Sequence, residues 1–375
     1  MTGPVRLSLD VSAVPDQPGG AGRYTIDLVA ALAKRGDVTM TLVARRGDAE
    51  RWAGIAPGAR VLAAVPGQRP ARLAWEQMRM PRLLRHVDVD LHHAPHYTMP
   101  ERARLPKVVT IHDLTFFDHP EWHERAKVPV FRRAIRVAAR HADALVCVSQ
   151  STADRLCELI EPVAPVHVVP NGVDPERFRE SAPDPEADLA ALAALGVRTP
   201  FIAFVGTIEP RKDVPTLVRA FDVMAAAHPD LQLVLAGGEG WGVDVVTTAI
   251  TVARHRGRVL RTGFVDDDVL PALLRSAAAV AYPSLEEGFG IPALEALACG
   301  APLVTTSGSA MEEVATGAAL LVPPGDARAL AGALDMVVRG DVGLAARRAL
   351  GLELARRHTW EACAAGHVDV YRSVL

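Results

Sequence analysis

Long hydrophobic runs are missing from this chain of 375 residues. No segment approaches the roughly 18–20 apolar residues that a membrane-spanning helix needs. The first residues, MTGPVRLSLDVSAVP, lack the apolar core and the small-residue cleavage site of a secretory signal. We therefore expect a cytoplasmic protein.

Cysteine is also scarce, and neither charge sign dominates. The four cysteines show neither C-x-x-C spacing nor a pattern of metal ligands, which favours reduced thiols that mostly fill the core. The residues in question are Cys147, Cys157, Cys299 and Cys363. Lys and Arg number 41 against 44 Asp and Glu, for a net charge of −3, so no nucleic-acid partner is expected.

Short apolar runs separated by helical stretches fill the first half of the chain. Continuous rather than alternating apolar strands indicate a parallel sheet that is covered on both faces. A helix is expected from about Arg23 to Arg35, after the segment GGAGRY. The expected strands are residues 5–11, 38–44, 108–113, 144–149 and 166–172.

The same alternation restarts after residues 178–197, a stretch rich in Pro, Asp, Glu and Ala that indicates a linker and a peripheral helix. Two such arrays predict an α/β protein with two doubly wound Rossmann-like domains facing each other across a cleft. We place the domains at residues 1–177 and 178–358. The sequence permits the last helix, at about 359–375, to pack back onto the first domain. The cleft is the expected active site.

A pair of glutamates stands out in YPSLEEGFGIPALEALACGAPLV. Glu287 follows a buried strand, and Glu295 lies about one turn into the helix that Pro292 begins. Gly288 and Gly290 let backbone N–H groups approach a ligand at the start of that helix. Carboxylates there can accept hydrogen bonds from the adjacent hydroxyls of a sugar or ribose. The alternative is structural, with Glu295 capping its own helix and Glu287 in solvent.

Two adjacent cations follow another strand in the segment VGTIEPRKD. Arg211 and Lys212 precede a helix with Pro215 in its first turn. The carboxyl ends of parallel strands share one edge of a sheet, so this pair should lie on the same edge as Glu287. An arginine fork beside a lysine point charge suits a diphosphate. A solvated pair is the alternative.

These segments together resemble the retaining glycosyltransferases of family 4, which have the two-domain GT-B architecture. The resemblance rests on GTIEPRKD and on EEGFGIPALE with its E-x7-E spacing. It covers nearly the whole chain, because GGAGRY, the HAP turn at residues 93–95, TIHDL, VSQSTADRL and VPNGVD follow in family order. One departure is Thr207, where many relatives carry arginine. The resemblance implies a nucleotide-sugar donor bound mainly by the second domain and an acceptor bound mainly by the first.

The resemblance also implies roles for individual residues. Glu295 would hold the ribose hydroxyls, Glu287 would contact the transferred sugar, and Arg211 with Lys212 would bind the diphosphate. His112, in TIHDL, would lie beside the donor sugar near the reaction centre. The remaining donor-binding positions implied by the resemblance are Gly19, Gly20, Gly288, Phe289 and Gly290.

The sequence thus predicts an enzyme that moves a hexose to a hydroxyl of a glycan or lipid-linked acceptor, without a metal or other cofactor. GDP-mannose is the first expectation for the donor, because the TIEPRK form of the motif resembles mannosyltransferases. Base recognition is expected around residues 237–241 and 263–265, and acceptor recognition in variable loops such as 45–68. Two alternatives are a nucleotide-sugar epimerase or phosphorylase of the same fold, and a non-catalytic binding protein.

Four other patterns have competing interpretations. DVD at 88–90 and DDD at 266–268 look like metal-binding motifs, but neither follows a strand beside a nucleotide motif. HHAPH at 92–96 lacks a spaced fourth zinc ligand, which favours loop histidines near the acceptor. GGAGRY has Thr25 where a dinucleotide fingerprint has its third glycine, which disfavours an NAD-dependent oxidoreductase.

The segment 69–87 carries five arginines against one acid, Glu76. It suits a solvated basic face, peripheral contact with an anionic membrane at its inner surface, or an acceptor's phosphate. Pro81 interrupts the helical pattern, which disfavours a single long amphipathic helix.

Overall fold

The computed structural model describes residues 3–340 and 343–375 and divides the chain into two compact units. The first unit runs to Asn171 and adds the C-terminal segment Trp360–Leu375, and the second unit is Gly172–Thr359. The sequence placed the boundary six residues later, at 177/178. Residues just after 171 belong with the second unit because Val173 N–H donates to His358 O at 2.9 Å and Val173 bridges Thr359.

A seven-stranded parallel sheet forms the centre of the first unit, in the order β3-β2-β1-β4-β5-β6-β7. Its direction of winding reverses between β1 and β4, which makes that point the topological switch. The strands are β1 (Val5–Asp10), β2 (Val38–Arg45), β3 (Arg60–Val65), β4 (Leu91–Ala94), β5 (Lys107–Ile111), β6 (Ala144–Cys147) and β7 (Val166–Val168).

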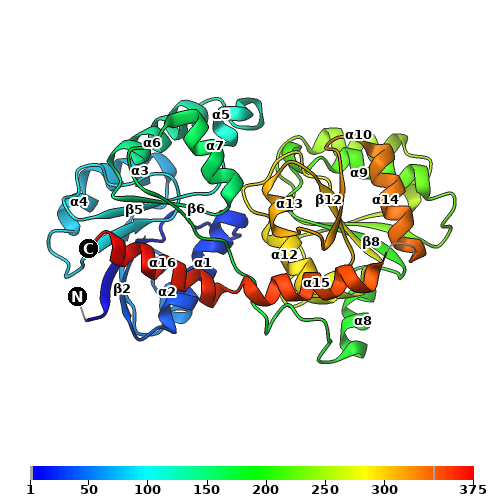
Figure 1. Ribbon diagram of the computed structural model, residues 1–375, viewed down its shortest axis with the longest axis horizontal. Helices are drawn as coiled ribbons and strands as arrows, with labels where there is room; N and C mark the ends of the chain where they lie inside the picture. The colour runs from blue at the N-terminus through cyan, green and yellow to red at the C-terminus, as the bar shows by residue number, and fades with distance from the viewer. Residues whose placement is uncertain (1–2, 341–342) are drawn as a thin grey trace. The chain divides into compact units, whose positions relative to one another are not determined.

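Helices cover both faces of this sheet. In Figure 1, α1, α2 and α16 lie on one face, and α3 and α6 lie on the other. The helices are α1 (Gly20–Ala33), α2 (Ala49–Ile55), α3 (Arg69–Met78), α4 (Met80–Leu83), α5 (Thr115–Asp118), η1 (Pro120–Trp122), α6 (Lys127–His141), α7 (Gln150–Ile160) and α16 (Trp360–Ser373). Helix α16 contacts α1, β1 and β6, so the C-terminal segment completes the first unit.

The second unit repeats the plan with six parallel strands in the order β10-β9-β8-β11-β12-β13. Its switch point lies between β8 and β11. The strands are β8 (Phe201–Val205), β9 (Gln232–Ala236), β10 (Val259–Gly263), β11 (Ala279–Tyr282), β12 (Leu303–Thr306) and β13 (Ala319–Val322). All four residues of β11 and of β12 are buried, as the apolar runs predict.

Helices α9, α10 and α14 lie on one face of the second sheet, and α12 and α15 lie on the other (Figure 1). The helices are α8 (Pro185–Ala194), η2 (Pro210–Lys212), α9 (Val214–Met224), α10 (Val243–Val252), η3 (Arg256–Arg258), α11 (Leu270–Ser276), α12 (Ile291–Ala298), α13 (Ala310–Val314), α14 (Ala327–Arg339) and α15 (Leu344–Arg357). The stretch 178–197 contains the expected peripheral helix, α8.

Two expectations about the first unit are wrong. Residues 45–68 are not simply variable loops, because they contain α2 and the edge strand β3. His92 and His93 are not loop residues, since both lie on β4 and are fully buried. Two histidines in a strand of only four residues remove the apolar pattern by which a buried strand is recognised.

Among the described residues, no helix is long and apolar enough to cross a membrane. The same part of the chain contains no cluster of three His, Cys, Asp or Glu side chains that would hold a metal ion. Asp88 and Asp90 of the DVD run form ion pairs with Arg6. In the DDD run, Asp267 pairs with Arg177, and the main chain of Asp266 accepts from Leu270 N–H at the start of α11.

Candidate functional site

The second unit brings its predicted site residues together at the switch point. Arg211 and Lys212 lie in η2, directly after β8, and Glu287 lies in the loop after the neighbouring strand β11. The two loops are joined where Leu285 N–H donates to Arg211 O at 2.7 Å. This is the edge of an open α/β sheet at which ligands bind.

The carboxylate of Glu287 is the centre of a compact ionic cluster. Arg211 Nη1 donates to Glu287 Oε2 at 2.5 Å, and Lys212 Nζ donates to Oε1. Ser284 Oγ donates to the same Oε1 at 3.0 Å. Arg211 also pairs through Nε with Glu209 at 2.5 Å. Both cations are therefore held in fixed positions by carboxylates.

Burial and charge set the protonation states in this cluster. Burial opposes ionisation of Glu287, but the charges of Arg211 and Lys212 and their hydrogen bonds outweigh it and lower the pKa to about 2. Burial and the neighbouring Arg211 lower the pKa of Lys212 below its usual value, against the attraction of Glu287. Glu287 therefore remains an anion throughout the physiological range.

Glu295 lies on α12 and is buried, with 7% of its surface exposed. Burial raises the pKa of the fully buried Tyr282 phenol, and the charges of Glu295 and Glu287 raise it further. The Glu295 carboxyl therefore lies near this phenol. The Tyr282 hydroxyl has no hydrogen-bond partner among the described residues. The charges of both glutamates therefore act on one buried phenol at the end of β11.

Gly290 precedes α12 in a left-handed conformation, with φ at +99°. A Cβ atom there would come within 2.1 Å of Met311 Sδ, so the fold itself requires glycine at this position. Phe289 is buried and its ring centroid lies 6.5 Å from that of His358. Gly288 is half-buried in the same loop.

The first unit places His112 just beyond the end of β5. Its Nε2 donates to Pro95 O at 2.8 Å, which leaves Nδ1 as the unprotonated ring nitrogen. Burial lowers the pKa of His112, so the ring is neutral near pH 7. Its ring meets that of Tyr24 edge to face at 4.8 Å.

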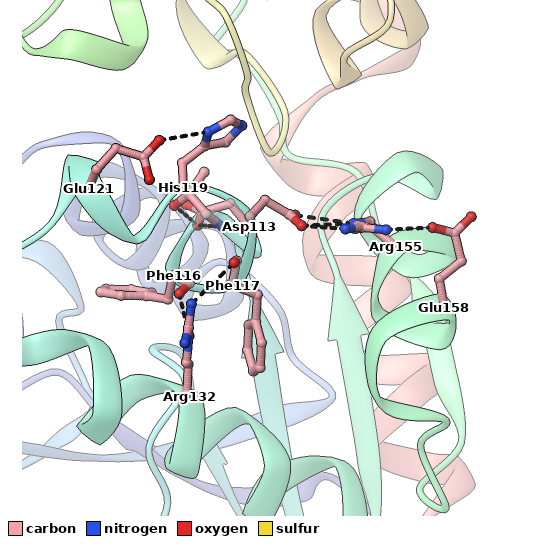
Figure 2. A network of polar contacts seen from close by, with 10 residues as sticks. Asp113, Phe116, Phe117, His119, Glu121, Arg132, Arg155 and Glu158 are labelled. Carbon is pink, nitrogen blue, oxygen red and sulfur yellow. Dashed lines mark hydrogen bonds and ion pairs between the residues drawn. The ribbon is translucent and has the colours of Figure 1, made fainter.

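The segment that follows His112 is held by two arginines (Figure 2). Arg132 of α6 donates to Phe116 O at 2.7 Å and to Phe117 O at 3.2 Å. Arg155 of α7 donates to the carboxylate of Asp118 and, at 2.9 Å, to Glu158. The short helix α5, which follows His112, is therefore held from both neighbouring helices.

Gly19 and Gly20 begin α1, at the end of the loop after β1. Gly19 is the residue before the helix, with φ at −82°, and its neighbour is the first helical residue. A Cβ atom added at either glycine would meet nothing within 4 Å. The protein itself therefore does not require glycine at these positions.

Sequence reasoning missed Tyr282 and Ser284 as members of the cluster around Glu287. Both lie in the motif AYPSLEE, but a tyrosine and a serine at a strand end have no distinctive spacing. The structure orders this turn further, since Thr306 Oγ1 donates to Ser284 O at 2.5 Å from β12. Only the sheet order places β12 next to β11.

Comparisons with known proteins find relatives that match most of the chain. Family models described as "Glycosyl transferases group 1" and "Glycosyltransferase Family 4" match residues 193–351 and 18–177. O-antigen chain mannosyltransferase B of Escherichia coli is 27% identical over 307 residues, which cover 81% of this chain and 77% of that protein. D-inositol 3-phosphate glycosyltransferase of Xylanimonas cellulosilytica is 31% identical over 413 residues, covering 98% of this chain and 96% of that protein.

A solved structure extends the likeness to the fold. Anabaena Alr3699/HepE in complex with UDP-glucose superposes with a TM-score of 0.78 over 98% of this chain and 99% of that one, at 21% sequence identity. Two parallel α/β units, matched in order by the two family models and by a full-length relative, establish the family. The chain belongs to glycosyltransferase family 4 and has the GT-B fold.

Proposed function

We propose that this glycosyltransferase is a retaining, metal-independent enzyme that transfers mannose from GDP-mannose to a hydroxyl of a glycan or lipid-linked acceptor. The observation that carries the proposal is the cluster of Arg211, Lys212 and Glu287 at the switch point of the second unit. The mannosyltransferase among the relatives supports the choice of sugar.

The cluster suits a nucleoside diphosphate sugar. Breaking a glycosyl–phosphate bond builds negative charge on the departing diphosphate. Cations that are already held in place stabilise this charge without reorganising during the reaction. Glu287 provides that positioning, because it fixes Arg211 and Lys212 together. An ionised carboxylate has about four acceptor sites, so three protein donors leave Glu287 one for a sugar hydroxyl.

Glu295 and His112 take the remaining roles in the proposal. Glu295, on α12, accepts hydrogen bonds from the ribose hydroxyls. His112 offers its unprotonated Nδ1 to a hydroxyl of the donor sugar, since its Nε2 proton is engaged by Pro95 O. A neutral imidazole fits a positioning contact. The acceptor hydroxyl attacks from the face that the diphosphate leaves, and a diphosphate oxygen takes its proton.

Binding of donors tests the proposal first. A thermal-shift series with GDP-mannose, UDP-glucose and NAD should show stabilisation by GDP-mannose, of about 2.7 kcal/mol at 100 times its dissociation constant. UDP-glucose is included because the Anabaena structure holds it. A shift with NAD alone would contradict the proposal, and a shift with UDP-glucose alone would replace the donor while keeping the reaction class.

The stereochemistry and the reaction class need a second measurement. Slow hydrolysis of GDP-mannose in water, followed by NMR, should release α-mannose first and free GDP. Conversion of the donor to another nucleotide sugar without an acceptor would indicate an epimerase. Trapping of a mannosyl ester on a carboxylate during turnover would contradict the proposed same-face attack.

A further inference from the structure

Arg72 is a buried cation that forms no ion pair with any residue the structure describes, although its charge partly offsets the rise that burial causes in the pKa of Glu76. It lies on α3 with 8% of its surface exposed, whereas Arg79, Arg82 and Arg85 farther along the same segment are exposed. Of the three interpretations of this segment, the solvated basic face therefore does not fit its first turn. Within residues 3–340 and 343–375, the Arg72 guanidinium makes no hydrogen bond or ion pair. Burying a charge in this way costs several kcal/mol unless something pairs with it.

Arg69 lies one turn earlier on the same face of α3. Its guanidinium is 5.0 Å from the centroid of the Phe131 ring, and it likewise has neither a hydrogen bond nor an ion pair in the described chain. Burial and the charge of Arg72 lower the pKa of Arg69, which places the two cations near each other. Like charges that face each other are disfavoured unless an anion lies between them.

Nearby acids do not neutralise this pair. Glu76 lies one turn beyond Arg72 and accepts from Thr98 Oγ1 at 2.8 Å and from Gln77 Nε2 at 3.1 Å. Burial and the charge of Asp10 raise the pKa of Glu76 to about 7, so it is only partly ionised at neutral pH. Glu124, the acid near Arg69, forms its ion pair with Lys127.

The pair lies beside the switch point of the first unit. His96, just beyond β4, has its ring centroid 6.0 Å from that of Phe131 and 6.0 Å from that of His112. His96 Nδ1 is buried and has no hydrogen-bond partner in the part of the chain that is described. The first turn of α3 adds a helix N-terminus without any acidic residue, which also favours an anion.

We propose that Arg69, Arg72 and His96 form a binding site for a phosphoryl group on the acceptor. The enzyme therefore glycosylates a phosphate-bearing molecule, whose hydroxyl is presented beside His112. The guanidinium forks match phosphate oxygens, and His96 completes the set of polar partners. The assignment of the phosphoryl group to an acceptor rests on the proposed function. The anion-binding site itself is argued from the contacts and burial of these three residues.

Isothermal titration of the full-length protein with inorganic phosphate tests the site. The double variant Arg69→Gln/Arg72→Gln is compared with Arg79→Gln/Arg82→Gln, which removes the same charge from the exposed turns. Phosphate should bind the wild type and the control equally, and the Arg69→Gln/Arg72→Gln protein at least about tenfold more weakly. Binding at Arg211 and Lys212 is common to all three proteins and cancels. If the double variant does not fold, Arg69→Gln alone replaces it, because Arg69 is half-buried.

Unchanged phosphate binding in the Arg69 and Arg72 variants, or an equal loss in the control, would overturn the inference. Pelleting with phosphatidylglycerol vesicles then identifies the source of the phosphoryl group. If the wild type pellets with the vesicles and the Arg69→Gln/Arg72→Gln variant does not, the phosphoryl group belongs to a lipid headgroup. If the wild type binds phosphate but does not pellet, the acceptor is a soluble phosphorylated molecule. Both results support the site. Failure of every nucleotide sugar to bind would remove the proposed function and leave the phosphate result intact.

Discussion

At the scale of single residues, Glu287 carries structure and proposed chemistry at once. Its carboxylate accepts from Arg211, Lys212 and Ser284, and Lys212 is itself buried. Removing the carboxylate would leave a buried ammonium group without its partner, which is costly. A test of catalysis at this position must therefore separate a loss of folding from a loss of transfer.

Glu287→Gln and Glu295→Ala should fail in different ways. Glu295→Ala should weaken nucleotide binding at least about tenfold, since hydrogen bonds to a charged group contribute about 1.5–3 kcal/mol. Glu287→Gln should mainly slow transfer and also lower the free energy of unfolding by about 3 kcal/mol. For both variants we would measure nucleotide affinity by calorimetry, the transfer rate by turnover, and the free energy of unfolding by urea denaturation. Glu286→Gln serves as the control. Equal losses of affinity and turnover in both would argue against separate roles.

Glu76 should make the stability of the first unit depend on pH. It is buried beside Asp10, Arg72, Thr98 and Gln77, and its pKa is raised to about 7 from an ordinary 4.5. Between those values the unfolded chain has lost the proton that the folded chain retains. Stability should therefore fall as pH rises from about 4.5 to 7, by up to about 3 kcal/mol from this group.

Glu76→Gln should remove that dependence, because an amide does not titrate. The measurement is the difference in free energy of unfolding between wild type and variant, from urea denaturation at pH 5 and pH 8. The wild type should lose stability relative to the variant at the higher pH. A difference that does not change with pH would mean that Glu76 is ionised normally in the folded protein.

At the scale of elements, the start of α1 offers a test of donor contact. Gly19 and Gly20 have open space where a Cβ would stand, so the fold alone does not explain glycine there. If the donor diphosphate packs against this helix start, a methyl group would exclude it. Gly19→Ala should then raise the donor KM about tenfold or more while leaving the melting temperature nearly unchanged.

Gly36→Ala is the matched control for that substitution, because a Cβ atom at Gly36 also meets nothing within 4 Å. It lies after the other end of α1, away from the loop that follows β1. The control should leave both the donor KM and the melting temperature as in the wild type. Wild-type kinetics in Gly19→Ala would remove this glycine from the donor site.

At the scale of the whole molecule, the last helix joins the first unit through buried polar groups. Tyr24 OH shares hydrogen bonds with His367 Nε2 at 2.7 Å and with Thr110 Oγ1 at 2.9 Å. His93 bonds to Thr110 Oγ1 at 2.8 Å and to the Tyr371 hydroxyl at 2.8 Å. Burial lowers the pKa of His93, so these are contacts of a neutral ring.

Tyr371→Phe should destabilise the protein by about 1–3 kcal/mol, because it leaves His93 Nδ1 buried without a partner. Urea denaturation followed by circular dichroism measures the loss. Ser373→Ala, on the same helix but at an exposed position where the hydroxyl donates to Val370 O, should change stability far less. Equal effects would mean that the buried network adds nothing beyond ordinary helix packing.

Much of the architecture could be predicted because it rests on local patterns. Apolar strand runs predicted the strands β1, β2 and β6 with the correct first residue. The strand β4 was missed because its two histidines break the apolar pattern, whereas β3 lies in a segment expected to be a loop although RVLAAV is largely apolar. The basic segment 69–87 is interrupted next to Pro81, since α3 ends at Met78 and α4 begins at Met80, but its buried first turn carries no local signal.

The sequence by itself determined the α/β class, the family, and the carboxylates and cations that bear the chemistry, because each is encoded by residues close together in the chain. The pairing of Glu287 with Lys212, 75 residues away, and the burial of Arg72 are visible only in the folded chain. Both depend on which strands and helices become neighbours. That order is set by packing of the whole unit, which no short stretch of sequence contains.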